Sequence, residues 1–250
     1  MKIDLSNKHI LVTGASRGIG YATTKQLLES GATVSMHYNR NSDSLIELQR
    51  QFPNHARLIK ADLSINDSCN KLIQKAIDAN GTLHGIVNNA GICIESSIDS
   101  DRWDSVWEQT FQVNTTAVGI LCKQALRHFT SNNGGYIINI SSRAAFRGDT
   151  TSHMAYAASK GALVALTRSI ARGYGKSNVK AFIIAPGFTK TDMADDFIQK
   201  YGEDFVKNDL ALDELTKPEH LAPTITFLLS GMADHLTGTT IDINAGSYVH

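Results

Sequence analysis

The amino-acid sequence predicts an α/β protein, in which a doubly wound parallel sheet has helices on both faces. Short runs rich in Ile and Val alternate along the 250 residues with longer segments of helical periodicity, a pattern typical of right-handed strand–helix–strand units. The strand-like runs rarely alternate apolar with polar residues, as expected for strands covered on both faces. No repeat, low-complexity tract or change of composition marks a linker, so we expect one domain over residues 1–250.

Seven short runs have the length and composition of strands. They are HILVT (9–13), TVSMHY (33–38), ARLIKA (56–61), HGIVNN (84–89), YIINIS (136–141), VKAFIIA (179–185) and TTIDIN (239–244). In a doubly wound sheet the ligand binds beyond the carboxyl ends of the strands, where the strand order reverses. The residues that follow these runs are therefore the first candidates for a functional site.

Helical segments separate the strand-like runs. Residues 18–30 carry apolar side chains near one side and are followed by Gly31, which is suited to end a helix. In residues 66–79 the apolar positions recur with i, i+3, i+4, i+7 spacing. The remaining predicted helices span 103–130, 154–174 and, beginning at a proline, 218–230.

Composition excludes several classes of function. Lys and Arg together number 24, as do Asp and Glu, so no overall basic charge favours binding to nucleic acid or to an anionic membrane. The three cysteines cannot all form disulfides with one another, which favours a reducing compartment. The N-terminal segment has no apolar stretch of the length of a signal peptide or membrane span. We therefore expect a cytoplasmic protein.

Three glycines, Gly14, Gly18 and Gly20, follow the first predicted strand and open the first predicted helix. Glycine allows a tight turn and a close approach to a diphosphate, which the helix N-terminus attracts. A tight turn without a ligand is the alternative. The turn also matches the G-x-S-x-G elbow of α/β-hydrolases around Ser16, but no earlier strand supplies the oxyanion-hole loop of those enzymes.

Tyr156 and Lys160 lie at positions i and i+4 of a predicted helix and so project from one face. A neighbouring ammonium favours the phenolate, and such a tyrosine can exchange a proton with a substrate oxygen. The alternative is a surface tyrosine that packs on a lysine stem. Ser142 follows a predicted strand, and Asn114 lies inside a predicted helix, where asparagine is unfavourable.

Together these motifs resemble the short-chain dehydrogenase/reductase family over essentially the whole chain. The motifs, in family order and spacing, are TGASRGIG (13–20), NNAG (88–91), Asn114, NISS (139–142), YAASK (156–160) and PGFTKT (186–191). The resemblance implies a single-domain Rossmann-type fold with a seven-stranded parallel sheet. It also implies hydride transfer between a nicotinamide cofactor and a carbonyl compound or secondary alcohol.

The resemblance implies a role for each of four catalytic residues. Tyr156 matches the acid/base, and Lys160 matches the lysine that holds the nicotinamide ribose and lowers the pKa of the tyrosine. Ser142 matches the serine that orients the substrate oxygen, and Asn114 the asparagine that supports a water-linked proton relay. The stretch between Ser142 and Tyr156 is slightly longer than is usual in the family.

The resemblance also implies the cofactor-binding residues, while the scattered histidines, without HExxH or CxxC motifs, give no sign of a metal site. Besides Tyr156 and Lys160, the implied cofactor contacts are Gly14, Ser16, Arg17, Gly18, Ile19, Gly20, Asn39, Arg40, Asp62, Leu63, Asn89, Ala90, Gly91, Pro186, Gly187, Thr189 and Thr191.

The end of the second predicted strand predicts NADP(H) as the cofactor. NAD enzymes of this architecture place Asp or Glu there to bind the ribose 2′-hydroxyl. Tyr38 occupies that position, and Arg40 and Arg17 are close enough in sequence to bind a 2′-phosphate. Solvated arginines on the surface are the alternative.

The sequence does not identify the substrate. A lid over about 188–215 is expected, and its acidic composition should repel an acidic acyl carrier protein. We therefore expect a small carbonyl or alcohol substrate. 3-Oxoacyl-(acyl-carrier-protein) reductase is the alternative, and a catalytically silent dinucleotide-binding regulator is a remote one. Apolar faces of 103–130 and 154–174 indicate a contact between two chains. The resemblance implies a homotetramer built from two dimers, with these helices in one contact and the C-terminal strand in the other.

Overall fold

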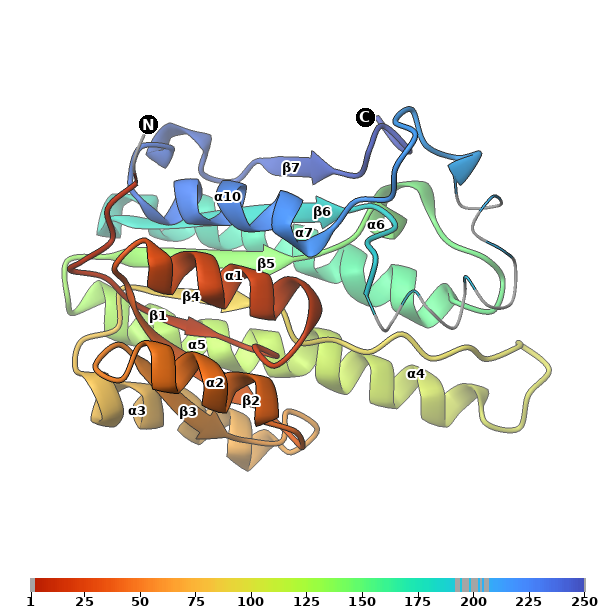
Figure 1. The fold of residues 1–250 in the computed structure, drawn as a ribbon. Helices are drawn as coiled ribbons and strands as arrows, with labels where there is room; N and C mark the ends of the chain where they lie inside the picture. Colours follow the sequence, from red (N-terminus) through yellow and green to blue (C-terminus); the bar gives the residue numbers. More distant parts are fainter. Residues whose placement is uncertain are drawn as a thin grey trace.

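A seven-stranded, entirely parallel sheet forms the centre of the computed structural model (Figure 1). The structure describes residues 3–191, 194, 198, 202, 204 and 207–249. The strands are β1 (His9–Val12), β2 (Thr33–Tyr38), β3 (Ala56–Lys60), β4 (Gly85–Asn88), β5 (Gly135–Ile140), β6 (Val179–Pro186) and β7 (Thr240–Ile243). Their order in the sheet is β3-β2-β1-β4-β5-β6-β7, so the direction of winding reverses between β1 and β4.

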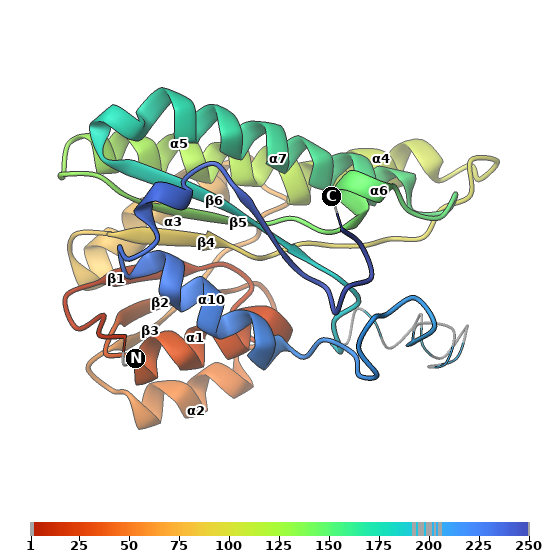
Figure 2. The ribbon, with the colours of Figure 1, turned by 90° about the horizontal axis from the view of Figure 1, so that it is seen from above.

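Helices cover both faces of the sheet. They are α1 (Gly18–Glu29), α2 (Asp43–Gln51), α3 (Asn66–Asn80), α4 (Trp103–Phe111), α5 (Ala117–Thr130), α6 (Ala144–Arg147), α7 (Met154–Tyr174) and α10 (Pro218–Leu229). A π-helical turn at Gln112–Thr116, here called the π-turn, joins α4 to α5. Seen from above, α1, α2 and α10 lie on one side of the sheet and α3, α5 and α7 on the other (Figure 2).

Two hydrophobic clusters fill the space between the sheet and its two helical layers. Successive strand residues point to opposite faces, and β1 shows the result. Ile10 and Val12 belong to the cluster with α1, α2 and α10, whereas Leu11 belongs to the cluster with α3, α5 and α7. This double burial explains why the strand sequences are continuously apolar.

The predicted fold class is confirmed, and each predicted strand ends within one residue of the observed one. Two differences concern helices. The helix predicted over 103–130 is interrupted by the π-turn, and the sequence analysis did not identify two helices, α2 after β2 and the short α6 after β5. Part of the predicted lid, residues 192, 193, 195–197, 199–201, 203, 205 and 206, lies outside the described residues.

The parallel strands all end at the same edge of the sheet, where the predicted site residues follow them. The glycine-rich turn follows β1, Asp62 follows β3, Asn89 follows β4, Ser142 follows β5, and Pro186 ends β6. Within the described residues, no helix combines the length and apolar character that crossing a membrane requires.

Candidate active site

The glycine-rich turn joins β1 to α1. Gly14 and Gly18 have positive φ angles of +63° and +52°, which glycine adopts without strain. A Cβ atom at Gly20 would lie 2.1 Å from the carbonyl oxygen of Gly14, so the turn closes because this position lacks a side chain. No side chain caps α1, whose half-buried Ile19 lies in the first turn. The N–H groups of that turn are therefore suited to bind a diphosphate.

The loop after β4 is fastened to this turn by hydrogen bonds. The side-chain amide of Asn89 donates to the carbonyl oxygens of Thr13 (2.9 Å) and Gly14 (3.1 Å). The backbone N–H groups of Asn89 and Ala90 both donate to the Thr13 hydroxyl, at 2.9 and 3.0 Å. These bonds hold the two predicted cofactor-binding loops side by side.

Asp62 presents a charged acceptor at the end of β3. Its carboxylate accepts hydrogen bonds from the hydroxyl (2.7 Å) and N–H (2.9 Å) of Ser64. These bonds lower the pKa of Asp62, and the charge of Arg40 lowers it further. The side chain of Leu63 is 5% exposed and belongs to the core. Leu63, a predicted cofactor-binding residue, could therefore contact a ligand only through its backbone.

The end of β2 and the glycine-rich turn expose two positive charges. Arg17, Asn39 and Arg40 are open to solvent, and the half-buried Tyr38 ends β2. The carbonyl group of Ser16 accepts a hydrogen bond from the Ser44 hydroxyl of α2 (2.6 Å). The last residue of β2 is therefore a tyrosine and not a carboxylate, and Arg40 follows two positions later.

The π-turn carries Asn114, which is fully buried. Its Oδ1 accepts the N–H of Ile92 (2.9 Å), and its Nδ2 donates to the carbonyl of Ile92 (2.9 Å) and to Ser159 Oγ (3.1 Å). A Cβ atom at Gly91 would lie 3.2 Å from Asn114 Oδ1 and 3.3 Å from Lys160 Nζ. The NNAG loop thus packs directly against two predicted catalytic residues. π-turns occur frequently at functional sites.

Helix α7 places Tyr156 and Lys160 one turn apart. Lys160 Nζ lies 5.7 Å from the centre of the Tyr156 ring and donates to the carbonyl oxygen of Ile140 at 2.8 Å. The Ser142 side chain lies close enough to the Tyr156 phenol to affect its pKa, and Ser142 Oγ accepts the N–H of Ala144 at 3.1 Å. The structure therefore brings Ser142, Tyr156 and Lys160 together, with Asn114 beside them.

The protonation of this cluster differs from the sequence-based expectation. Burial raises the pKa of the Tyr156 phenol above its ordinary value, although the Ser142 side chain opposes the shift. Burial also lowers the pKa of Lys160 to about 8. The net pKa of Tyr156 is therefore raised in the protein without ligands, because burial disfavours the phenolate. That Lys160 lowers this pKa stays a prediction.

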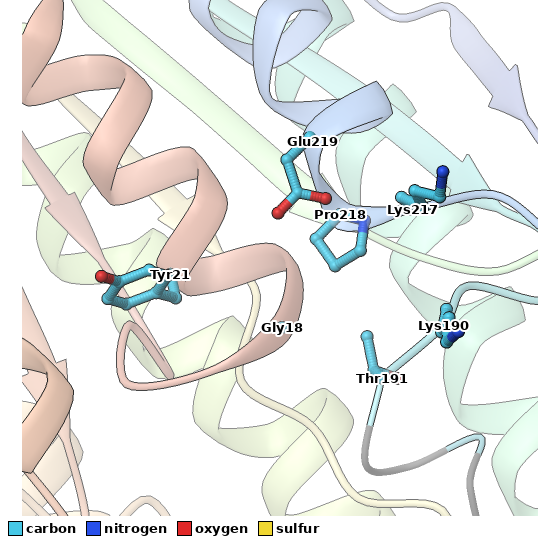
Figure 3. Close-up of a pocket in the computed structure, with 7 residues that line it drawn as sticks. All are labelled: Gly18, Tyr21, Lys190, Thr191, Lys217, Pro218 and Glu219. Carbon is cyan, nitrogen blue, oxygen red and sulfur yellow. The ribbon is translucent and has the colours of Figure 1, made fainter.

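The segment after β6 lies against the glycine-rich turn. A Cβ atom at Gly18 would lie 3.0 Å from Thr191 Cγ2. Thr191 donates to the carbonyl of Thr189 (3.2 Å), and Thr189 in turn donates to that of Gly187 (3.2 Å). A cavity of about 310 Å³ opens beside this contact (Figure 3). Its lining residues are Gly18, Tyr21, Lys190, Thr191, Lys217, Pro218 and Glu219.

Sequence analysis missed His37, which supports the glycine-rich turn from β2. The N–H of Gly14 donates to His37 Nδ1 (3.1 Å), and that of Ala15 donates to the His37 carbonyl (2.9 Å). Nε2 contacts the carbonyl of Ala61 at 3.2 Å, which fixes the neutral Nε2–H tautomer. Burial lowers the pKa of His37 to about 4. The feature of the sequence that could have identified this residue is a histidine within an otherwise largely apolar strand.

Comparisons with known proteins agree with this architecture. The family model of the short chain dehydrogenases matches residues 8–202. The chain is 32% identical to a 2,3-dihydro-2,3-dihydroxybenzoate dehydrogenase of Escherichia coli (strain K12), covering 98% of both chains. It is 30% identical to a 3-oxoacyl-(acyl-carrier-protein) reductase of Aquifex aeolicus (strain VF5), covering 99% of this chain and 100% of the relative.

A solved structure shows the same likeness in three dimensions. It is a short-chain dehydrogenase/reductase of the glucose/ribitol dehydrogenase type from Brucella melitensis, with a TM-score of 0.90, 29% identity and full coverage of both chains. Among the described residues, no three His, Cys, Asp or Glu side chains gather where a metal ion could bind. The chain belongs to the short-chain dehydrogenase/reductase family and is an oxidoreductase of that family.

Proposed function

We propose that this protein interconverts a carbonyl compound and a secondary alcohol, with NADP(H) as its cofactor. The observation that carries the proposal is the contact of Tyr156 with Ser142 and Lys160, at the sheet edge where the glycine-rich turn lies. The nicotinamide, when bound, would supply or accept the hydride.

Two hydroxyl groups act on the substrate oxygen. Ser142 Oγ accepts the Ala144 N–H, which orients the side chain, and its O–H, which faces the Tyr156 phenol here, would donate to a carbonyl oxygen bound in the cleft. The raised pKa of Tyr156 keeps the phenol protonated at neutral pH, and it donates its proton as the carbonyl is reduced.

Lys160 and Asn114 support the tyrosine in this proposal. Lys160 binds the nicotinamide ribose, and its pKa of about 8 keeps much of the ammonium charged at neutral pH. Asn114 fixes the NNAG loop and Ser159 through its three hydrogen bonds, and supports proton supply behind the lysine.

The uncapped α1 N-terminus, the two positive φ angles and the exposed arginines fit a dinucleotide. We assign the diphosphate to the glycine-rich turn, adenosine to the ends of β2, β3 and β4, and the carboxamide to the segment after β6. The contacts comprise Gly14, Ser16, Arg17, Gly18, Ile19, Gly20, Asn39, Arg40, Asp62, the Leu63 backbone, Asn89, Ala90, Gly91, Pro186, Gly187, Thr189 and Thr191.

A spectrophotometric panel tests the proposed reaction. Oxidation of NADPH is followed at neutral pH with ketones, diketones and 3-oxoacyl thioesters, and NADH replaces NADPH in parallel. We expect turnover of at least one small carbonyl compound. Binding of NADPH without turnover of any panel member would instead support the remote alternative of a silent dinucleotide-binding regulator.

3-Oxoacyl-(acyl-carrier-protein) reductase activity is the second candidate, because several relatives carry that name. The described part of the predicted lid argues against it, since Asp204, Asp213 and Glu214 add negative charge there and would repel an acidic carrier. Acetoacetyl thioesters on the carrier protein and on coenzyme A separate the two functions. A kcat/KM at least tenfold higher with the carrier-bound substrate would establish the second candidate.

Domain organisation, assembly and location complete the proposal. We infer one domain over 1–250 with a substrate lid at about 188–215, and a homotetramer as the working assembly. The three cysteines, Cys69, Cys93 and Cys122, are free thiols, which supports a cytoplasmic location.

A further inference from the structure

Two arginines next to Ser142 share one carboxylate. Arg143 Nη1 lies 2.7 Å and Arg147 Nη1 lies 3.0 Å from the same oxygen, Asp209 Oδ2. The Arg143 side chain is 11% exposed, whereas those of Arg147 and Asp209 are 38% and 42% exposed. None of the three is among the catalytic or cofactor-binding residues proposed above, although Asp209 lies within the segment proposed as a lid.

Arg143 and α6 control the surroundings of Ser142. The N–H of Arg143 donates to the carbonyl of Pro186 at 3.0 Å, which ties the end of β5 to the end of β6. The next residue, Ala144, donates its N–H to Ser142 Oγ at 3.1 Å. A displacement of α6 would therefore move the group that holds the Ser142 hydroxyl.

The short helix α6 requires contacts with other parts of the protein to be stable. It has four residues, and a helix of one turn is unstable in isolation because nucleation is unfavourable. Arg143 and Arg147 are four positions apart, so their like charges lie on one face and repel each other. Burial and the charge of Arg147 lower the pKa of Arg143, while Asp209 raises it. The Asp209 carboxylate therefore offsets the repulsion within α6.

The segment around Asp209 is itself anchored to the rest of the protein. The N–H groups of Ala211 and Leu212 donate to the carbonyl of Ala245, at 2.8 and 3.2 Å. Three residues further along the C-terminal segment, Tyr248 stacks on Phe146 of α6 with 6.3 Å between ring centres. Asp209 thus connects α6 to an anchored loop.

We propose that Asp209 is a positioning residue for the reaction. By pairing with Arg143 and Arg147 it fixes α6, and α6 fixes the hydroxyl of Ser142 toward Tyr156. This inference rests on the proposed role of Ser142 at the substrate oxygen.

The variant Asp209→Asn removes the charge and keeps the size of the side chain. Hydrogen exchange of residues 143–148, measured by mass spectrometry, should become about tenfold faster because α6 loses its support. Asp234→Asn is the matched control, since Lys180 and Asp234 form a pair of similar exposure (16% and 31%, 2.9 Å) away from α6. This control should leave exchange in 143–148 unchanged. Unchanged exchange in Asp209→Asn would overturn the proposal without requiring a substrate.

A double-mutant cycle with Ser142→Ala separates positioning from general structure. With the best substrate of the panel, Asp209→Asn should lower kcat about tenfold in the wild-type background and have little effect in Ser142→Ala. Equal losses in both backgrounds would contradict action through Ser142. If Ser142→Ala alone retained full activity, the proposed role of Ser142 would fail, whereas the exchange result for α6 would stand by itself.

Discussion

Tyr156 and Lys160 show how burial determines protonation at single residues. Both lie in α7, and burial opposes the phenolate and the ammonium alike. The raised pKa of Tyr156 keeps the phenol protonated at neutral pH, whereas the sequence motif alone favoured a lowered pKa. The sequence located the pair, but the sign of the pKa shift depends on the surrounding packing.

Replacing Tyr156 tests the proton transfer. Tyr156→Phe removes one oxygen atom from a side chain whose ring remains packed. We expect kcat to fall about 100-fold or more through loss of general acid catalysis. The Kd for NADPH, measured by fluorescence titration, should stay within about threefold as the control. Wild-type turnover in this variant would exclude Tyr156 as the proton donor.

Arg40 tests the cofactor preference. Its guanidinium is exposed near Asp62 and Tyr38, and a charge-assisted hydrogen bond to a 2′-phosphate contributes about 1.5–3 kcal/mol. The wild-type enzyme should therefore prefer NADPH to NADH in kcat/KM by about tenfold or more. Arg40→Asp should narrow or reverse that preference. Arg50→Asp, a charge change at the end of α2 where the side chain is 75% exposed, serves as the matched control. Equal or better efficiency of the wild-type enzyme with NADH would contradict the assignment.

At the scale of elements, strands were predictable and irregular helices were not. Ile10, Leu11 and Val12 are apolar because both sheet faces are buried, and that pattern is visible in the sequence. Asn114 was identified as an unfavourable helix residue, but the π-turn around it depends on tertiary bonds to Ile92 and Ser159.

The same distinction applies to the elements of the candidate site. Four of the predicted motifs, TGASRGIG, NNAG, NISS and PGFTKT, lie at the carboxyl ends of strands, and the parallel arrangement brings them to one edge. The pairing of Arg143 with Asp209 joins residues 66 positions apart, and no local sequence pattern predicts it. The support of the glycine-rich turn by His37 likewise depends on a contact between β1 and β2.

At the scale of the whole molecule, buried histidines should make the fold sensitive to acid. Burial lowers the pKa of both His9 and His37 from 6.5 to about 4. The unfolded chain therefore takes up protons below pH 6.5 that the folded protein does not bind until about pH 4. The contribution of these histidines to the free energy of unfolding is complete above about pH 6.5 and decreases as the pH falls toward 4.

Urea denaturation at pH 7 and pH 5 measures this effect. We expect the free energy of unfolding to fall by about 2 kcal/mol per histidine between the two values. His37→Gln keeps a hydrogen-bond donor and an acceptor but does not titrate. The free energy of unfolding of this variant should therefore fall by about 2 kcal/mol less between pH 7 and pH 5 than that of the wild-type protein. The same pH dependence in His37→Gln as in the wild-type protein would contradict this account.

The surface bears on the assembly of the whole molecule. Several apolar residues expected at an interface, among them Val118, Leu121 and Leu163, are instead buried within the chain. Apolar surface nevertheless remains. A groove of about 340 Å³ between α5 and α7 is lined in part by Leu126, Leu166 and Tyr174, and Trp103, Trp107 and Phe111 of α4 stack in series while half exposed.

The far edge of the sheet offers a second contact. β7 is the outermost strand and none of its residues is fully buried, and an open edge of this kind favours pairing with another chain. Two separate contacts, the α5–α7 face and the β7 edge, are what an assembly of two dimers requires.

Light scattering at micromolar concentration should therefore give the mass of four chains. Leu166→Glu places a charge in the α5–α7 groove. Because a second chain packed on this groove would remove water from that charge at a large cost in free energy, the variant should have the mass of two chains or one. Glu219→Gln, a charge change outside the groove, should leave the tetramer intact as a control. A wild-type monomer at this concentration would contradict the assembly, and the half-exposed aromatic series on α4 would then need another role.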